Sequence, residues 1–281
     1  MILLNAFAVL AAVQQAQPLW QPNLNWRPTI TWHPTVPRQG SLVIVSAPDA
    51  VSGELASEPL HFESGQALAA VPLDVPDTVT LHVIARHDPI VQRFDVALAV
   101  TARHEAGERI QAAERFTPAP DSALLVRLTR ERALSRDVSA RAHTVPRLWK
   151  LPFVRPRKAR VTSPFGAGRE VNGVWRSTHF GLDIAGRTGA LVRASNRGVV
   201  ALVGDFFYGG LSIYVHHGMG LMTSYHHLSR ALVSVGDTVA RGQIIGRVGT
   251  SGRVTGPHLH WGAQYGGVAF DPTDLLQLHL P

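Results

Sequence analysis

The chain has 281 residues, a length that predicts two domains of ordinary size rather than one large domain. Its composition, 45% hydrophobic and 17% charged, is that of a soluble globular protein and excludes disordered and collagen-like classes. The chain contains no cysteine, which excludes disulfides, thiolate metal sites, a cysteine nucleophile and a lipid anchor on cysteine.

The formal net charge of +7 is concentrated in one segment. Residues 121–160 hold eleven lysines and arginines against three acidic residues, whereas the remainder is close to neutral. Such a segment can contact nucleic acid, an anionic envelope polymer or acidic lipid, or it can be an ordinary solvated helix and linker. No zinc-finger, RNP or basic-zipper pattern accompanies it, so we expect no specific nucleic-acid partner.

The first residues resemble a signal peptide in length and composition. The apolar run over residues 2–13 is too short to span a bilayer, so no transmembrane span is expected. Small residues, among them Ala11, Ala12 and Ala16, lie near a candidate cleavage point. The departure is the missing basic flank, because no lysine or arginine precedes Arg27. We expect residues 1–17 to be a signal peptide and the protein to be exported.

Residues 41–102 contain short alternating or β-branched stretches such as SLVIVS, TVTLHVIA and FDVALAVTA, separated by turn-forming residues. This pattern predicts a β-sandwich-like domain over residues 18–117. It contains no catalytic grouping. His104 and Glu105 open like a metalloprotease H-E-x-x-H motif, but position 108 is glutamate, so we expect a solvated loop there.

Residues 121–141 carry apolar side chains at helical spacing among arginines: Leu124, Leu125, Leu128, Leu134 and Val138. Asp121 or Ser122 can cap the start of this helix, and Pro146 would end any helix that extends to it. The economical interpretation is a helix and basic linker, residues 118–147, between two domains.

Glycine marks the second domain, because 21 of the 25 glycines follow residue 150. Short strand candidates recur there between glycine, aspartate and asparagine turns: GVVALV, LSIYVHH, GLMTSYHHL, QIIGRVG and HLHWGAQ. The fold class is therefore mainly β, with a sandwich-like N-terminal domain, a connecting helix and a glycine-rich antiparallel β domain over residues 148–281.

Seven of the fourteen histidines fall between positions 179 and 260. On a strand His179, Gly181 and Asp183 share one face, and the central glycine leaves room between the imidazole and the carboxylate. His258 and His260 share a face in the same way; alone, such a pair is often two half-buried sheet histidines. Two histidines and a carboxylate suit a catalytic zinc ion, which takes three protein ligands and keeps one open position.

Residues 160–272 resemble the lysostaphin/LytM-type zinc endopeptidases that cut peptidoglycan peptides. The resemblance rests on TSPFGAGR, HFGLDIAG, LSIYVHHG, SYHHL, VGDTVARGQIIGRVGTSG and TGPHLHWG, which occur in family order over nearly the whole C-terminal domain. The sandwich and helix upstream resemble, more loosely, exported members with a β-rich N-terminal domain.

The resemblance implies roles for five residues. His179, Asp183 and His260 would bind one Zn²⁺ ion, and His227 and His258 would be catalytic histidines that do not bind the metal. Alternation supports His227 over its neighbour, because Tyr225 and His227 would share a face.

Three departures from the family pattern stand out. His226 replaces a usual small residue, His216 and His217 take a place where an acidic residue is common, and Arg169 lies one position later than the family arginine. The two adjacent histidines look structural, and the substrate role of Arg169 is in doubt. The loop over residues 246–256 lacks the G-K-[ST] of a phosphate cradle, so we expect it to shape the backbone beside the groove.

The predicted function is zinc-dependent hydrolysis of peptide cross-links in bacterial peptidoglycan, by a monomer in the periplasm or cell envelope. Its partners would be peptidoglycan peptide stems or cross-links. One alternative is a non-catalytic LytM-type activator of cell-wall amidases, although such proteins lack ligands that are complete here. Two further alternatives are a D-Ala-D-Ala carboxypeptidase-like zinc enzyme and a nucleic-acid-binding protein. The carboxypeptidase-like enzyme needs a wider spacing between the histidine and the aspartate than this sequence has.

Overall fold

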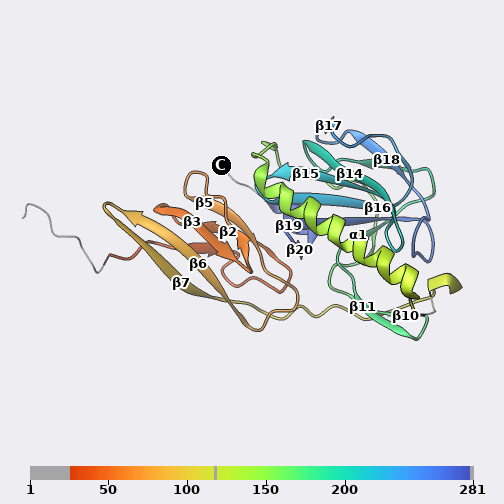
Figure 1. Cartoon of the computed structure of the whole chain (residues 1–281), viewed down its shortest axis with the longest axis horizontal. Helices are drawn as coiled ribbons and strands as arrows, with labels where there is room; N and C mark the ends of the chain where they lie inside the picture. Colours follow the sequence, from red (N-terminus) through yellow and green to blue (C-terminus); the bar gives the residue numbers. More distant parts are fainter. Residues whose placement is uncertain (1–25, 117–118, 279–281) are drawn as a thin grey trace, which may run out of the picture.

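The computed structural model describes residues 26–116 and 119–278. The expected signal peptide, residues 1–17, lies outside the described residues. Among the described helices, none is long and apolar enough to cross a membrane. Figure 1 shows two small sheets at one end of the molecule and a large sheet at the other, as expected for a mainly β protein.

The N-terminal part consists of two small antiparallel sheets. One has the order β1-β2-β5, with bounds Thr31–His33, Leu42–Ser46 and Gln66–Ala70. The other has the order β4-β3-β6-β7, with bounds Glu58–Pro59, Ala50–Leu55, Thr78–His87 and Ile90–Ala99. Alternate residues of β6 are buried, among them Leu81, Val83 and Ala85, because one face of this strand packs into the core.

The large sheet has ten strands and occupies the second half of the chain. Its main path runs β17-β14-β15-β16-β19-β12-β9, while β13 and β18 pair beside β16, and β20 pairs with β19. The bounds along the path are Thr238–Val239, Gly198–Phe206, Gly210–Gly218, Leu221–Ala231, His258–Tyr265, Leu182–Ala185 and Val161–Ser163. The remaining strands are β13 (Leu191–Arg193), β18 (Ile244–Val248) and β20 (Val268–Phe270).

One α-helix, α1 (Ser122–Arg141), crosses a face of the large sheet (Figure 1). The Asp121 carboxylate caps it by accepting a hydrogen bond from the backbone N–H of Leu124 at 2.8 Å, as the sequence predicts. Val138 packs against Tyr214 and Met222 of the sheet. Of the predicted apolar stripe, Leu125 and Leu134 stay exposed. The helix therefore covers only part of this face.

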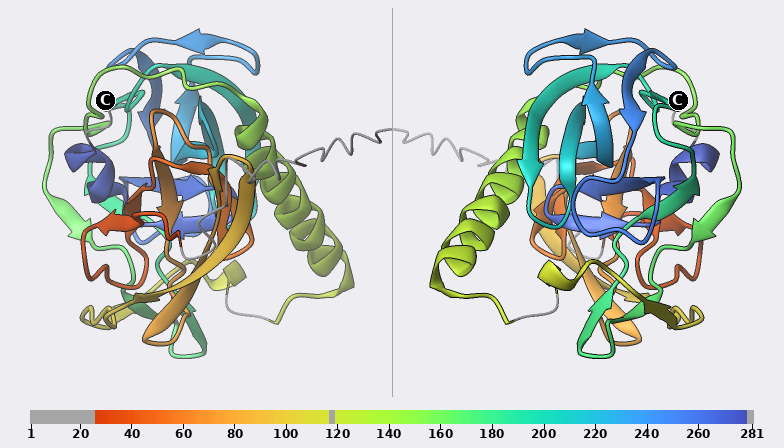
Figure 2. Two further views of the ribbon diagram at one scale, coloured as in Figure 1. Left: turned by 90° about the vertical axis from the view of Figure 1, so that its left-hand side faces the viewer. Right: turned by 90° about the vertical axis from the view of Figure 1, so that its right-hand side faces the viewer.

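Short 3-10 helices complete the chain: η1 (Glu114–Phe116), η2 (Ala142–Thr144) and η3 (Pro272–Gln277). The last is a short 3-10 turn capped by Asp271. It packs against the first sheet, where the Asp274 carboxylate accepts a hydrogen bond from the backbone N–H of Leu42 at 2.8 Å. The end views of Figure 2 place this turn beside the N-terminal strands.

A third small sheet joins the two halves. Strand β8 (Glu108–Ile110) pairs in parallel with β10 (Gly168–Val171), which pairs with β11 (Trp175–Thr178). His104 and Glu105 lie in a loop, as expected, and a strand begins at Glu108. No local pattern marks this strand, since its partner follows far along the chain.

Candidate metal centre and catalytic cleft

The three predicted metal ligands meet at the start of β12. Asp183 and His260 are direct register partners on neighbouring strands, so their side chains leave the sheet on the same face. His179 reaches them from just before β12. Its Nε2 lies 2.9 Å from His260 Nδ1 and 3.0 Å from Asp183 Oδ1, and the last two atoms lie 2.9 Å apart. Three ligand atoms thus converge on one point.

This donor set fits a zinc ion. The Nδ1–H of His179 donates to the carbonyl of Pro164 at 2.7 Å, which leaves its Nε2 lone pair free for a metal. Two ligands at zinc–nitrogen distance and tetrahedral angle stand about 3.3 Å apart, close to the separations found here. Burial raises the pKa of the Asp183 carboxyl, but the imidazoles of His179 and His260 beside it lower that pKa well below its usual range, so the carboxylate is charged.

Gly181 has a more specific role than leaving space. A Cβ at this position would stand 2.4 Å from Nε2 of His260, far inside van der Waals contact. Any other residue would push the His260 imidazole away from the other two ligands. The glycine in the H-x-G-x-D pattern is therefore required by the opposite strand.

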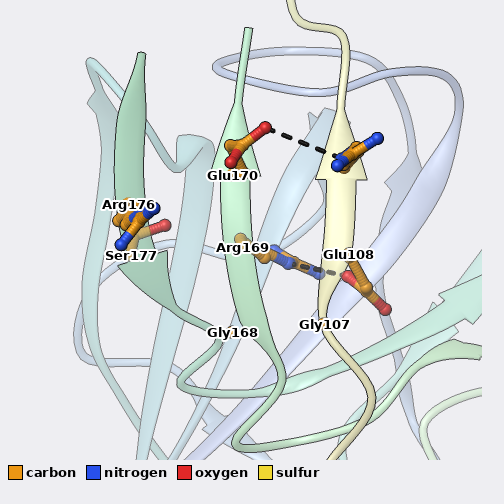
Figure 3. A pocket seen from close by; sticks show the side chains of 8 residues that line it. Gly107, Glu108, Gly168, Arg169, Glu170, Arg176 and Ser177 are labelled. Atoms are coloured by element: carbon orange, nitrogen blue, oxygen red, sulfur yellow. Dashed lines mark hydrogen bonds and ion pairs between the residues drawn. The ribbon is translucent and has the colours of Figure 1, made fainter. Parts of the chain in front are cut away.

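The second oxygen of Asp183 is held by Arg169. The Nη2 of this arginine lies 2.5 Å from Asp183 Oδ2, and its Nε donates to Glu108 Oε2 at 3.1 Å. Ser163 joins the network by accepting from Arg169 at 2.7 Å and donating to Glu108 at 2.8 Å. Figure 3 shows Arg169 and Glu108 paired across β10 and β8. The sequence placed Arg169 near the site but missed Glu108.

His258 and His227 lie together beside the metal ligands, with ring centroids 4.9 Å apart. Each donates its Nδ1–H to a backbone carbonyl at 2.9 Å, His258 to Gly256 and His227 to Ser251. The Nε2 of His258 lies 3.6 Å from Asp183 Oδ1. Burial, together with the neighbouring His260 and His258, lowers the pKa of His227 to about 3. Both rings are therefore oriented by the backbone.

The strand alternation expected at His226 and His227 does not hold in the structure. His227 has φ +60°, and the β15–β16 and β16–β18 registers shift around this point, so Tyr225 and His227 do not share a simple face. Tyr225 is fully buried, whereas His227 reaches the cleft. His226 pairs with His260 across the strands, but hydroxyls of Ser212 and Ser224 bond both its ring nitrogens, at 2.7 and 2.9 Å. No nitrogen of His226 remains for a metal.

His216 and His217 lie in the interior, away from the metal ligands. His216 donates to the carbonyl of Val138 on α1 at 2.7 Å. His217 is completely buried between the Arg197 carbonyl and the Thr223 hydroxyl, and burial lowers its pKa to about 4. Both side chains hold elements together, as their sequence context indicates.

A cleft of about 410 Å³ opens over the site. Its lining combines Asp183, His227 and His258 from the large sheet with Glu108 and Arg109 from β8 and with Arg253 from the β18–β19 loop. The first half of the chain thus contributes one wall.

Comparisons with known proteins agree with this site. Residues 177–272 match the family model described as Peptidase family M23. The peptidoglycan DD-endopeptidase ShyA of Vibrio cholerae is 42% identical over 106 residues, covering 37% of this chain and 24% of that protein. The DD-carboxypeptidase/endopeptidase Mpg of Neisseria meningitidis is 38% identical over 117 residues, covering 41% of this chain and 27% of that protein. The chain therefore spans about a quarter of the length of these relatives.

The fold similarity extends further than the sequence similarity. A crystal structure of an M23-type protein from Pseudomonas aeruginosa superposes with a TM-score of 0.65 at 26% identity, covering 85% of this chain and 95% of that chain. The N-terminal sheets are thus included in the match. The chain belongs to peptidase family M23, in its lysostaphin/LytM-type form, with an additional β-rich N-terminal region.

Proposed function

We propose that the protein is a zinc-dependent endopeptidase that hydrolyses peptide cross-links of bacterial peptidoglycan. The observation that carries the proposal is the complete set of His179, Asp183 and His260, with two further histidines facing the same cleft. An amidase activator has no need of such a set. Because all three ligands come from one chain, we propose that a monomer suffices.

Zinc is the metal that we propose for this donor set. A zinc ion held there would lower the pKa of water toward neutrality and polarise the scissile carbonyl. Two imidazoles and one carboxylate, without cysteine, match catalytic rather than structural zinc sites. Magnesium and calcium prefer sites built from oxygen ligands.

His227 and His258 are proposed as the acid–base residues. Their Nδ1–H groups are engaged by carbonyls, which directs each Nε2 into the cleft. A neutral imidazole there can take a proton from the attacking water and later return it to the leaving amine. The low pKa of His227 keeps this ring neutral at neutral pH.

The D-alanyl cross-link is the bond that we propose is cut. The relatives ShyA and Mpg are named for DD-endopeptidase activity. Mpg is also named as a DD-carboxypeptidase, so removal of a terminal D-alanine is a second activity to score. This substrate lies in the cell envelope, so we further propose that the protein is exported.

Digestion of purified sacculi with the zinc-loaded full chain tests the proposal. We expect cross-linked dimers to give monomers by cleavage of D-alanyl bonds, detected by chromatography and mass spectrometry of muropeptides. A His260→Ala protein should release nothing. Intact dimers after digestion, together with stimulation of a wall amidase, would instead support the activator alternative.

A further inference from the structure

Arg253 is the feature of the cleft that the chemistry above does not use. It lies in the loop between β18 and β19 and lines the same cavity as Asp183 and His258. Its backbone N–H donates to the carbonyl of Tyr208 at 2.9 Å, and its guanidinium carbon stands 4.5 Å from the centre of the Tyr208 ring. Two contacts therefore fix where this side chain points.

The half-buried Arg253 guanidinium has no carboxylate partner in the part of the chain that the structure describes. Arg169, on the same cavity, is by contrast paired with both Glu108 and Asp183. Burial lowers the pKa of Arg253, and Arg169 lowers it further, so an anion placed beside Arg253 would be favoured. A cation partly removed from water without a counter-charge is costly, and a bound anion offsets that cost.

A second hollow, of about 330 Å³, continues from Arg253 toward α1. Arg132 of α1 and Arg176 of β11 also line it, and its lining contains no acidic residue. Within the described ranges, neither arginine forms an ion pair. Figure 3 shows Arg176 on β11, on the side of β10 opposite to Glu108. Three arginines that have no carboxylate partner among the described residues therefore lie together at this hollow.

We propose that Arg253, assisted by Arg132 and Arg176, binds a free carboxylate of the peptide substrate close to the bond that is cut. This inference rests on the proposed function and deepens it, because it assigns a substrate class: peptides whose side-chain carboxylate is free rather than amidated. A planar guanidinium binds a carboxylate through two parallel hydrogen bonds, which an amide cannot reproduce.

Two synthetic cross-linked peptides test the assignment, identical except for a carboxylate or a carboxamide on the residue beside the D-alanyl bond. With the zinc-loaded full chain, we expect kcat/KM to favour the acid by about tenfold or more. Arg253→Gln should reduce this preference to within about twofold, and Arg253→Lys should restore part of it. Arg230→Gln is the matched control, because Arg230 is exposed on β16 outside the cleft; it should keep the full preference.

Binding gives a second readout that does not depend on turnover. Calorimetry with zinc-loaded His258→Ala protein should show tighter binding of the acid peptide, and the additional Arg253→Gln change should remove the difference. Equal affinity for both peptides overturns the carboxylate site. If neither peptide is cut but the acid still binds more tightly through Arg253, the carboxylate site stands and the hydrolytic function fails.

Discussion

His179, Asp183 and His260 are held at one end of a regular sheet, whereas Glu108 reaches the cleft on a separate strand 61 residues before its partner Arg169. The first group is positioned by strand register and by a glycine that lets two strands approach closely. The second depends on a parallel pairing between the two halves of the chain. The wall from the large sheet is therefore set by contacts within one half of the chain, whereas the wall from β8 is set by a contact between the two halves. Substitutions in the two walls should have different effects.

The largest expected effect is at the sheet wall. His260→Ala removes one of three ligands, so zinc content and peptide hydrolysis should be lost together. His258→Ala leaves the ligand set intact; zinc should stay near one ion per chain while activity falls by about 10²- to 10⁴-fold, the usual worth of a positioned acid–base group. Elemental analysis beside rate measurements checks both. Loss of zinc from the His258 variant would show that the two roles are wrongly assigned.

His227 and His226 are adjacent yet should behave differently. His227→Ala should cost about as much activity as His258→Ala and retain zinc, because its Nε2 faces the cleft. His226→Ala should be mild in rate, since serine hydroxyls engage both of its ring nitrogens. Steady-state kinetics on both variants, with thermal melting to score stability, is the measurement. A severe His226 defect in kcat with normal stability would contradict this difference.

The wall from the first half of the chain should show a smaller effect. Glu108→Gln weakens the partner of Arg169, which in turn holds Asp183, and such outer contacts typically change metal affinity or activity by about 10- to 100-fold. Competition with a chelator measures the zinc affinity. Glu170→Gln is the control and should change little, because among the described residues Glu170 pairs only with the exposed Arg109, at 3.7 Å. Equal effects would mean that Glu108 has no special role.

The smallest effect concerns the contact between the N-terminal sheet and the last turn. Burial raises the pKa of Asp274 to about 6, above the ordinary 3.8 of the unfolded chain. The folded state then holds a proton that the unfolded state has lost, so this group lowers stability as pH rises from about 4 to 6, by on the order of 3 kcal/mol. Asp274→Asn should remove that component. Denaturant unfolding at several pH values measures it, and parallel pH curves for both proteins would refute it.

The metal ligands could be predicted from sequence because strand alternation is local and the motifs are dense. The family resemblance was needed to select His260, because a periodicity of two gives His258 and His260 the same face. The geometry of His227 could not be predicted from sequence, because a positive φ and a register shift break the strand alternation at this residue. The glycine-rich loop was expected only to shape the backbone; Gly252 does so, as a Cβ would stand 2.4 Å from the N of Gly210. The direction of the Arg253 side chain depends on Tyr208, which no pattern in the loop encodes.

The domain boundaries remain a prediction. We expect residues 148–281 to fold when expressed alone, since the metal ligands lie within them. Without β8 that fragment has no Glu108, and without α1 it exposes Tyr214 and Met222. It should therefore bind zinc more weakly than the full chain, which chelator competition on the two proteins can measure.

The hydrogen bond between Leu42 and Asp274 also has a consequence for the order in which the molecule is completed. These residues are 232 positions apart, and the backbone of Asp271 bonds Gly40 beside them at 2.8 Å. During synthesis every metal ligand emerges before η3, so the metal site can be assembled while η3 and the first sheet are still unjoined. Contacts this distant in sequence form late and slow the folding of a chain. The turn η3, which is synthesised after every metal ligand, therefore fastens β2 to the large sheet.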